Sequence, residues 1–178
     1  MKRLIYILLA ASALLVSCTK ETRELAYSKQ EALIEKFVTK QAESSGLRVV
    51  QNGGATRLVL VEGEGMELTA RGKVKVYFAL YDFTSGMING TKLIATNSKE
   101  QASSAGWSLT DADYEALELD MTDHGILQGL RDGLAGVQEG EDCYILFTGK
   151  YAFGKNNTGT IPANAPLAFR INVLSVEN

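Results

Sequence analysis

The period of the hydrophobic pattern changes at Gly46, and this change limits the possible folds more than any other feature. From Glu21 to Glu43 the sequence has no Gly or Pro, and helix formers dominate. Apolar residues within Ala32–Val38 have helical spacing, and Ser28-Lys29-Gln30-Glu31 ahead of them fits a capping box. Ser44-Ser45-Gly46 is expected to end this helix. Beyond it, apolar residues alternate with polar ones, a pattern that predicts strands.

The segment after Gly46 is predicted to fold as an antiparallel α+β domain. Asn52-Gly53-Gly54 lies between two apolar runs, which is typical of a hairpin. An order of helix, strands, short helix and strands favours this class over βαβ repeats. The expected elements are strands over 47–50, 57–61, 73–80 and 117–119, a short helix over 126–134, and strands over 143–147 and 167–176, with 98–106 as a polar loop.

Composition narrows the chemistry that the chain can perform. Its 178 residues, 46% apolar and 22% charged, suit one domain with a sizeable core. The formal charge is −3 and no basic cluster is visible, so a nucleic-acid partner is not expected. One histidine and two cysteines supply too few ligands for a zinc or iron–sulfur site, so no metal or other cofactor is expected. A Ser-His-Asp mechanism would depend on His124, and no G-x-S-x-G motif accompanies it.

The N-terminus has the features of a targeting segment. Met1-Lys2-Arg3 precedes an apolar run over 4–16 that is short for a membrane span. The run ends in Leu15-Val16-Ser17-Cys18, which resembles a bacterial lipobox, in which the cysteine becomes lipidated after cleavage before it. A plain signal peptide with an incidental cysteine is the alternative. Loss of residues 1–17 would take the formal charge from −3 to −5, so lipid rather than basic residues would hold the chain at a membrane.

These patterns predict three segments: a signal peptide over 1–17, a lipid-anchored spacer or helix over 18–46, and a domain over 47–178. The helix around Ala32–Val38 could pack on its own domain, or it could serve as a spacer or form a homodimer. Thr19-Lys20 lacks the Asp that retains some lipoproteins at the inner membrane, so we expect the outer membrane, facing the periplasm.

Four stretches between Leu58 and Glu177 resemble the FKBP-type peptidyl-prolyl cis-trans isomerases. The two most specific resemble the family's V-I-x-G-W-x-x-G and Y-A-Y-G…I-P-P-N-x-x-L-x-F patterns. The resemblance implies a twisted antiparallel sheet wrapped around one short helix, with an apolar cup between them that binds proline-containing polypeptides. The four stretches are Leu58–Gly65, Gly72–Phe78, Gly125–Leu134, and Tyr151–Gly154 together with Gly159–Phe169.

The resemblance also implies which residues line the cup, and several depart from the family pattern. Phe78, Ile94 and Phe153 stand at catalytic positions where the family has Tyr, Asp and Tyr. Leu130 replaces a Trp, and Leu93 and Leu117 replace aromatic residues, so the cup stays apolar and loses its polar side chains. The expected substrate-binding residues are Leu93, Leu117, Ile126, Leu127, Leu130, Ile161 and Phe169.

An apolar cup alone can favour rotation about an X–Pro bond. The barrier of about 18–20 kcal/mol comes from amide resonance, and no proton transfer or nucleophile is needed. Moving the amide out of water and holding it twisted favours the transition state. The sequence therefore predicts a weak isomerase that assists the folding of exported proteins. The alternative is a peptide-binding, chaperone or assembly module with little or no catalysis.

Overall fold

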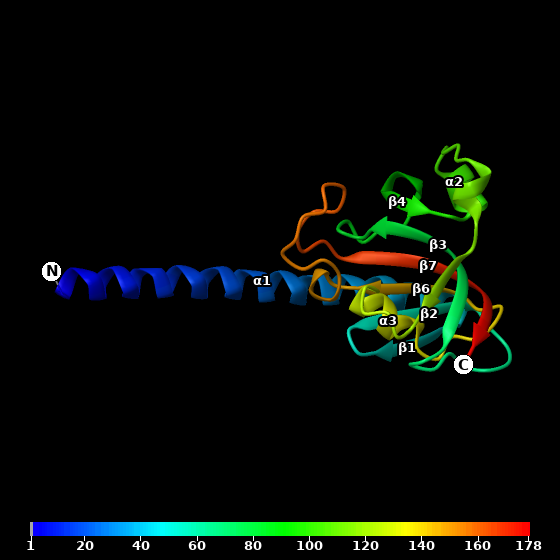
Figure 1. The fold of residues 1–178 in the computed structure, drawn as a ribbon, viewed down its shortest axis with the longest axis horizontal. Helices are drawn as coiled ribbons and strands as arrows, with labels where there is room; N and C mark the ends of the chain where they lie inside the picture. Colours follow the sequence, from blue (N-terminus) through cyan, green and yellow to red (C-terminus); the bar gives the residue numbers. More distant parts are fainter. Residues whose placement is uncertain (1) are drawn as a thin grey trace.

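The computed structural model describes residues 2–178, with side chains from Lys20 onward. One long helix, α1 (Lys2–Ser45), leads into the domain that the rest of the chain forms (Figure 1). The helix ends where the sequence predicts: Gly46 has a φ of 65° and its N–H donates to the Ala42 carbonyl at 2.7 Å. Its predicted start is wrong, because Ser28 lies inside α1. Helix formers flank Ser28 on both sides, so the helix continues through it.

Within residues 2–178, seven strands form one sheet, and all of the pairings are antiparallel. The order is β1-β2-β6-β7-β3-β4, and β5 also pairs with β3. The predicted hairpin, the long third strand and the two C-terminal strands are confirmed. The strands are β1 (Arg48–Asn52), β2 (Ala55–Val61), β3 (Lys73–Asp82), β4 (Leu93–Thr96), β5 (Leu117–Asp120), β6 (Asp142–Phe147) and β7 (Leu167–Glu177).

The short helices lie in the connections between the strands. The predicted helix near residue 126 is present as α3 (Gln128–Leu134). The segment 98–106, expected to be a loop, contains α2 (Lys99–Ser104), and the Ser98 side chain caps it by accepting from the Gln101 N–H. Single 3₁₀ turns are η1 (Gly90–Lys92), η2 (Asp111–Tyr114) and η3 (Gly149–Tyr151).

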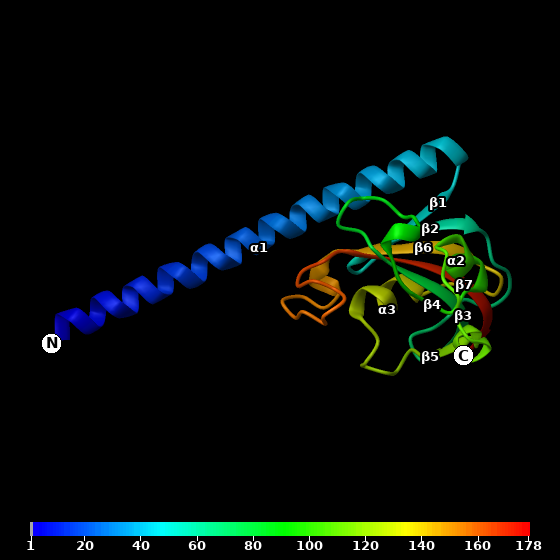
Figure 2. The ribbon, with the colours of Figure 1, turned by 90° about the horizontal axis from the view of Figure 1, so that it is seen from above.

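The sheet is covered on both faces, and each face has its own hydrophobic cluster. On one face α3 contributes Leu130 and Leu134, and on the other α1 contributes Ile34 and Val38. Figure 2 shows the two helices on opposite sides of the sheet. Successive residues of a strand point to opposite faces, so Ile145 and Phe147 of β6 join the α3 face while Leu146 joins the α1 face.

The C-terminal half of α1 packs on its own domain, which is the first of the two alternatives for this helix. Tyr27, Ile34 and Val38 are 6%, 5% and 4% exposed. The Phe37 ring meets the buried Phe83 ring edge to face, with 5.3 Å between centroids. The helix therefore shields a core face of the sheet.

This packing gives a prediction for stability. We expect Ile34→Ala to lower the free energy of unfolding by about 2–4 kcal/mol, because it removes a buried side chain and leaves a cavity. Lys36→Ala, at an exposed position of the same helix, is the control and should change it by less than about 0.5 kcal/mol. Urea unfolding of both variants measures the difference. Equally small losses of unfolding free energy in both variants would mean that α1 does not pack on the sheet in solution.

Candidate functional site

Helix α3 lies unusually close to β6, and two glycines permit this approach. Gly129 and Gly133 are four residues apart and face the sheet. A Cβ at Gly129 would collide with the Phe147 ring, and one at Gly133 would collide with Ile145. The close contact fixes the height of α3 above the sheet, so the neighbouring residues Ile126 and Leu130 are also buried against it.

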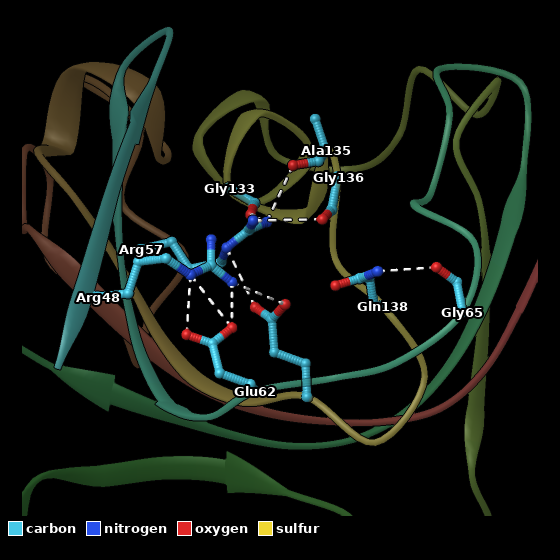
Figure 3. Close-up of polar contacts among 9 residues, drawn as sticks. Arg48, Arg57, Glu62, Gly65, Gly133, Ala135, Gly136 and Gln138 are labelled. Carbon is cyan, nitrogen blue, oxygen red and sulfur yellow. Dashed lines mark hydrogen bonds and ion pairs between the residues drawn. The ribbon is translucent and has the colours of Figure 1, made fainter.

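A buried arginine from β2 holds the C-terminal end of α3. Arg57 is 3% exposed, and its Nη1 donates to the carbonyls of Gly133 and Ala135, both at 2.9 Å. Its Nη2 donates to the Gly136 carbonyl at 3.4 Å (Figure 3). The last carbonyls of a helix lack partners within the helix and carry its negative dipole end. A cation there donates hydrogen bonds to these carbonyls and also interacts favourably with the dipole.

Glu141 supplies the countercharge for Arg57. It is fully buried, with its Oε1 3.1 Å from Arg57 Nε, and Arg48 Nη2 lies 3.9 Å from its other oxygen. Burial raises the pKa of Glu141, and the attraction of Arg57 opposes that rise. Burial likewise raises the pKa of the neighbouring Cys143 thiol, which keeps it protonated. Arg48 also binds the exposed Glu62 through two nitrogens.

The β1–β2 hairpin contacts the same helix through Asp132. The N–H of Gly54 donates to Asp132 Oδ2 at 3.1 Å, and Asn52 Nδ2 donates to the Asp132 carbonyl at 3.0 Å. Gly53 between them has a φ of 55°, and a Cβ there would collide with the Asp132 carboxylate. The turn predicted from Asn52-Gly53-Gly54 thus also helps to position α3.

The α3 face brings together nine of the ten residues expected to line the cup. Four are buried, at 9% exposure or less, and form a floor: Ile126, Leu130, Ile161 and Phe169. Four more are partly exposed and pack against that cluster: Phe78, Ile94, Leu127 and Phe153. Leu117 is 40% exposed at the rim, directly opposite the buried Val76 in the β3–β5 ladder, and so lies on the same face.

Leu93 is a correction, because it lies on the other face of the sheet. It is 8% exposed and belongs to the cluster formed with Ile34 and Val38 of α1. Leu93 and Ile94 are neighbours on β4, so only one of them can face α3. Because both residues are apolar, the sequence does not indicate which of them faces α3 and which faces α1. The sequence also missed Leu119, which packs against the α3-face cluster.

The cup residues present aromatic and aliphatic surface. The Phe78 and Phe169 rings lie 6.3 Å apart at 45°, and the Phe147 ring stacks on Phe169 with 5.9 Å between centroids. The Phe78, Ile94 and Phe153 side chains offer no conventional hydrogen-bond donor or acceptor. The arrangement can therefore remove a peptide bond from water, but these three side chains cannot hydrogen-bond to it.

A buried asparagine that the sequence did not indicate holds the backbone at Phe78. Asn97 is 6% exposed, and its Oδ1 accepts from the Phe78 N–H at 2.6 Å. Its Nδ2 donates to the Glu115 carbonyl at 2.9 Å. Asn97 thereby ties β3 to the segment that leads into β5, on which Leu117 lies.

The loop between Tyr151 and Pro166, which we call the flap, carries Phe153 and Ile161 and is hydrogen-bonded to α1. Tyr27 Oη donates to Asn164 Oδ1 at 2.6 Å, and Gln30 Nε2 donates to the Asn164 carbonyl at 2.8 Å. Gln30 Oε1 also accepts from the Gly149 N–H at 2.9 Å. Asn164 has a φ of 59°, a conformation unusual for a residue with a side chain. The helix therefore holds the base of the flap.

We expect Gln30→Ala to lower kcat/KM for a prolyl peptide by about fivefold while leaving the chain folded. The substitution breaks two hydrogen bonds at the flap base, each contributing about 0.5–1.5 kcal/mol. Lys29→Ala, an exposed neighbour on α1, is the matched control and should leave kcat/KM unchanged. A protease-coupled or spectroscopic assay of isomerisation at several peptide concentrations separates KM from kcat. Equal activity of the two variants would show that α1 does not position the flap.

Comparison with known proteins agrees with this architecture. The family model for FKBP-type peptidyl-prolyl cis-trans isomerases matches residues 81–174. Among solved structures, FkpA from Escherichia coli superimposes with a TM-score of 0.57 at 20% identity, covering 96% of this chain and 70% of that one. A peptidyl-prolyl cis-trans isomerase from Pseudomonas syringae pv. tomato gives 0.57 at 16% identity, covering 85% and 95%. The N-terminal domain of FKBP42 from Arabidopsis thaliana gives 0.56 at 15%, covering 74% and 93%. No curated protein matches the chain.

These findings define the class of protein. The fold is the predicted FKBP-like α+β fold, an antiparallel sheet with one short helix against it, preceded by α1. The family match spans more than half of the sequence. The chain belongs to the FKBP-type peptidyl-prolyl cis-trans isomerase family.

Proposed function

We propose that the chain is a weak isomerase of X–Pro bonds in exported polypeptides. The observation that carries this proposal is the cup: partly exposed Phe78, Ile94, Leu127 and Phe153 above a buried apolar floor. A prolyl ring bound there leaves water together with its amide, and loss of solvation favours the twisted transition state over the planar ground state.

The same residues explain why the rate should be modest. Hydrogen bonds to a bound peptide contribute about 0.5–1.5 kcal/mol each, and more when one partner is charged. Phe78, Ile94 and Phe153 supply none of them through their side chains. Hydrophobic burial of the prolyl residue remains, so binding should be less affected than turnover.

Isomerisation of Ala-X-Pro-Phe peptides by the full chain tests the proposal. We expect catalysis above the spontaneous rate, strongest when X is a large apolar residue, because the cup offers apolar surface. Catalysis that is absent for every X, in a folded sample, would contradict it.

The alternative is a peptide-binding, chaperone or assembly module with little or no catalysis. The loss of all three expected polar side chains favours this candidate. It predicts that prolyl peptides bind, as measured by calorimetry, and that their isomerisation is not accelerated. The two measurements on one sample separate the two functions.

We also propose that the chain is a lipoprotein of the cell envelope, anchored through Cys18 at the outer membrane and facing the periplasm. The support is the lipobox-like Leu15-Val16-Ser17-Cys18 behind a basic start and an apolar run. The side chain of Cys18 lies outside the described side chains. In the described part of the chain, no helix is both long and apolar enough to cross a membrane. Labelled palmitate should enter the wild type but not Cys18→Ala, and equal labelling would end this proposal.

The segment boundaries at 17 and 46 and the homodimer through the N-terminal helix stay predictions. The apolar stripe of α1 is occupied by its own sheet at Ile34 and Val38. Leu25, at 57% exposure, is the large apolar residue that α1 leaves uncovered among its described side chains. Among the described side chains of α1, Leu25 is therefore the one that a dimer contact would use, and Leu25→Glu with sedimentation analysis would test it.

A further inference from the structure

A second groove lies on the opposite side of the sheet from the cup. It has a volume of about 620 Å³ and runs between α1 and the β1–β2 hairpin. Ile34, Val38 and Leu146 form its apolar floor, and Val49 of β1, 38% exposed, lies on the far wall. The cup residues lie on the α3 face, whereas the groove lies beside α1, and Figure 2 shows these two helices on opposite sides of the sheet.

The helical wall of this groove is acidic. Glu31, Glu35 and Glu43 line it, and no lysine or arginine does. None of the three forms an ion pair with any residue from Lys20 to Asn178. Lys36 and Lys40 do not line the groove; they line an adjoining, more open surface of α1 that Glu35 and Glu43 also border. The groove thus combines apolar surface with three carboxylates that form no ion pair within residues 20–178.

A buried hydroxyl without a partner lies in the same groove. Thr148 is 2% exposed, and its Oγ1 has no hydrogen-bond partner in the described part of the chain. It follows Leu146 by two residues in extended backbone, so its side chain is on the α1 face and lines the groove. A buried polar atom normally has a partner, and leaving it without one is unfavourable. A ligand that enters the groove can supply that partner.

We propose that this groove binds a short, extended polypeptide segment with lysine or arginine residues next to apolar ones. The carboxylates of α1 attract the cations, the floor buries the apolar side chains, and Thr148 meets a backbone group of the segment. From Glu31 to Glu43 the helix rises about 18 Å, which matches about five residues of extended chain. The inference deepens the proposed role in folding, because a client could be held here while its proline occupies the cup.

The test uses a peptide without proline, so that the cup cannot account for binding. Fluorescein-labelled Lys-Val-Lys-Val-Lys-Val is titrated with the full chain and followed by fluorescence anisotropy. We expect saturable binding that weakens as salt is raised, because exposed charges are screened. Glu35→Lys should weaken binding about tenfold, since it removes one attraction and adds one repulsion. Glu118→Lys, an exposed change on β5, is the control and should leave the affinity within about twofold of wild type.

Thr148→Val tests the hydroxyl without opening a cavity. It removes a polar atom that has no partner in the free chain, so thermal stability should stay equal or rise, while peptide affinity falls about fivefold. Isomerisation of Ala-Leu-Pro-Phe should be unchanged by Glu35→Lys, which separates a failure of the groove from a failure of the cup.

Three outcomes would overturn the proposal. Displacement of the labelled peptide by excess Ala-Leu-Pro-Phe would place it in the cup. Equal affinities of wild type, Glu35→Lys and Thr148→Val would show that neither the carboxylate nor the hydroxyl takes part. Absence of binding, together with self-association that Glu35→Lys abolishes, would make the groove a contact between two copies of the chain.

Discussion

Arg57→Leu should lower the free energy of unfolding by about 3–5 kcal/mol, the largest loss that we expect from a single substitution. It leaves Glu141 buried without its countercharge and leaves the carbonyls at the end of α3 without donors. Arg48→Leu is the matched control, because Arg48 pairs mainly with the exposed Glu62. An exposed pair contributes at most about 1 kcal/mol, so urea unfolding should separate the two variants clearly.

The loss in Arg57→Leu should depend on pH. Burial already makes the pKa of Glu141 higher in the folded chain than in the unfolded one, and removing Arg57 raises it further. The folded state then binds a proton more readily, so its stability falls as pH rises above the ordinary carboxyl range. The destabilisation should therefore be smaller at about pH 5 than at about pH 7.

A second substitution checks the origin of this loss. Arg57→Leu/Glu141→Leu removes both charges and should recover part of the stability, because buried ion pairs are often no more stabilising than apolar residues in their place. A double variant as unstable at both pH values as Arg57→Leu would show that the helix cap, not the uncompensated carboxylate, dominates.

Ile94→Asp/Phe153→Tyr should raise kcat/KM about tenfold if it recovers roughly 1.4 kcal/mol of transition-state stabilisation. Both residues are partly exposed on the α3 face, so neither new polar group is fully buried. Phe153→Tyr alone adds one hydroxyl and should alter stability little. Ile94→Asp alone places a carboxylate among apolar side chains and should perform worse than the pair.

The decisive measurement compares kcat/KM among Ile94→Asp, Phe153→Tyr and the double variant. Each is assayed with Ala-Leu-Pro-Phe, and its fold is confirmed by circular dichroism. Leu93→Asn is not a usable control, because Leu93 is buried in the cluster on the α1 face of the sheet. Glu118→Asn, at an exposed position of β5 outside the expected cup residues, is a suitable one. A folded double variant with unchanged kcat/KM would favour the peptide-binding module over the isomerase.

The parts of the fold that the sequence could predict are those set by local pattern. Alternation from Lys73 to Leu80 gives a strand, Asn52-Gly53-Gly54 gives a turn, and the spacing of Ile126 to Leu134 gives a helix. Each signal is contained within a few neighbouring residues. The family resemblance adds which face forms the cup, and nine of the ten expected residues lie on that face.

The parts that could not be predicted depend on contacts between distant segments. Arg57 in an apolar run resembles a surface residue, and its carboxylate partner is 84 positions further along the chain. The apolar stripe of α1 predicts burial without naming the surface that buries it. Gln30 and Tyr27 resemble ordinary helical residues, and only the folded flap brings Asn164 to them.

The attachment of α1 to the flap has a mechanical consequence. From Lys20 to Ser45 the helix contains no Gly or Pro at which it could hinge, and Tyr27 and Gln30 are part of that stiff rod. A force applied to the chain ahead of Lys20 is therefore expected to be transmitted along the helix without bending it. It arrives at Asn164, at the root of the loop that carries Phe153 and Ile161. We therefore expect tension on the N-terminus to alter the shape of the cup's edge, and a force-clamp measurement on the tethered chain would test this.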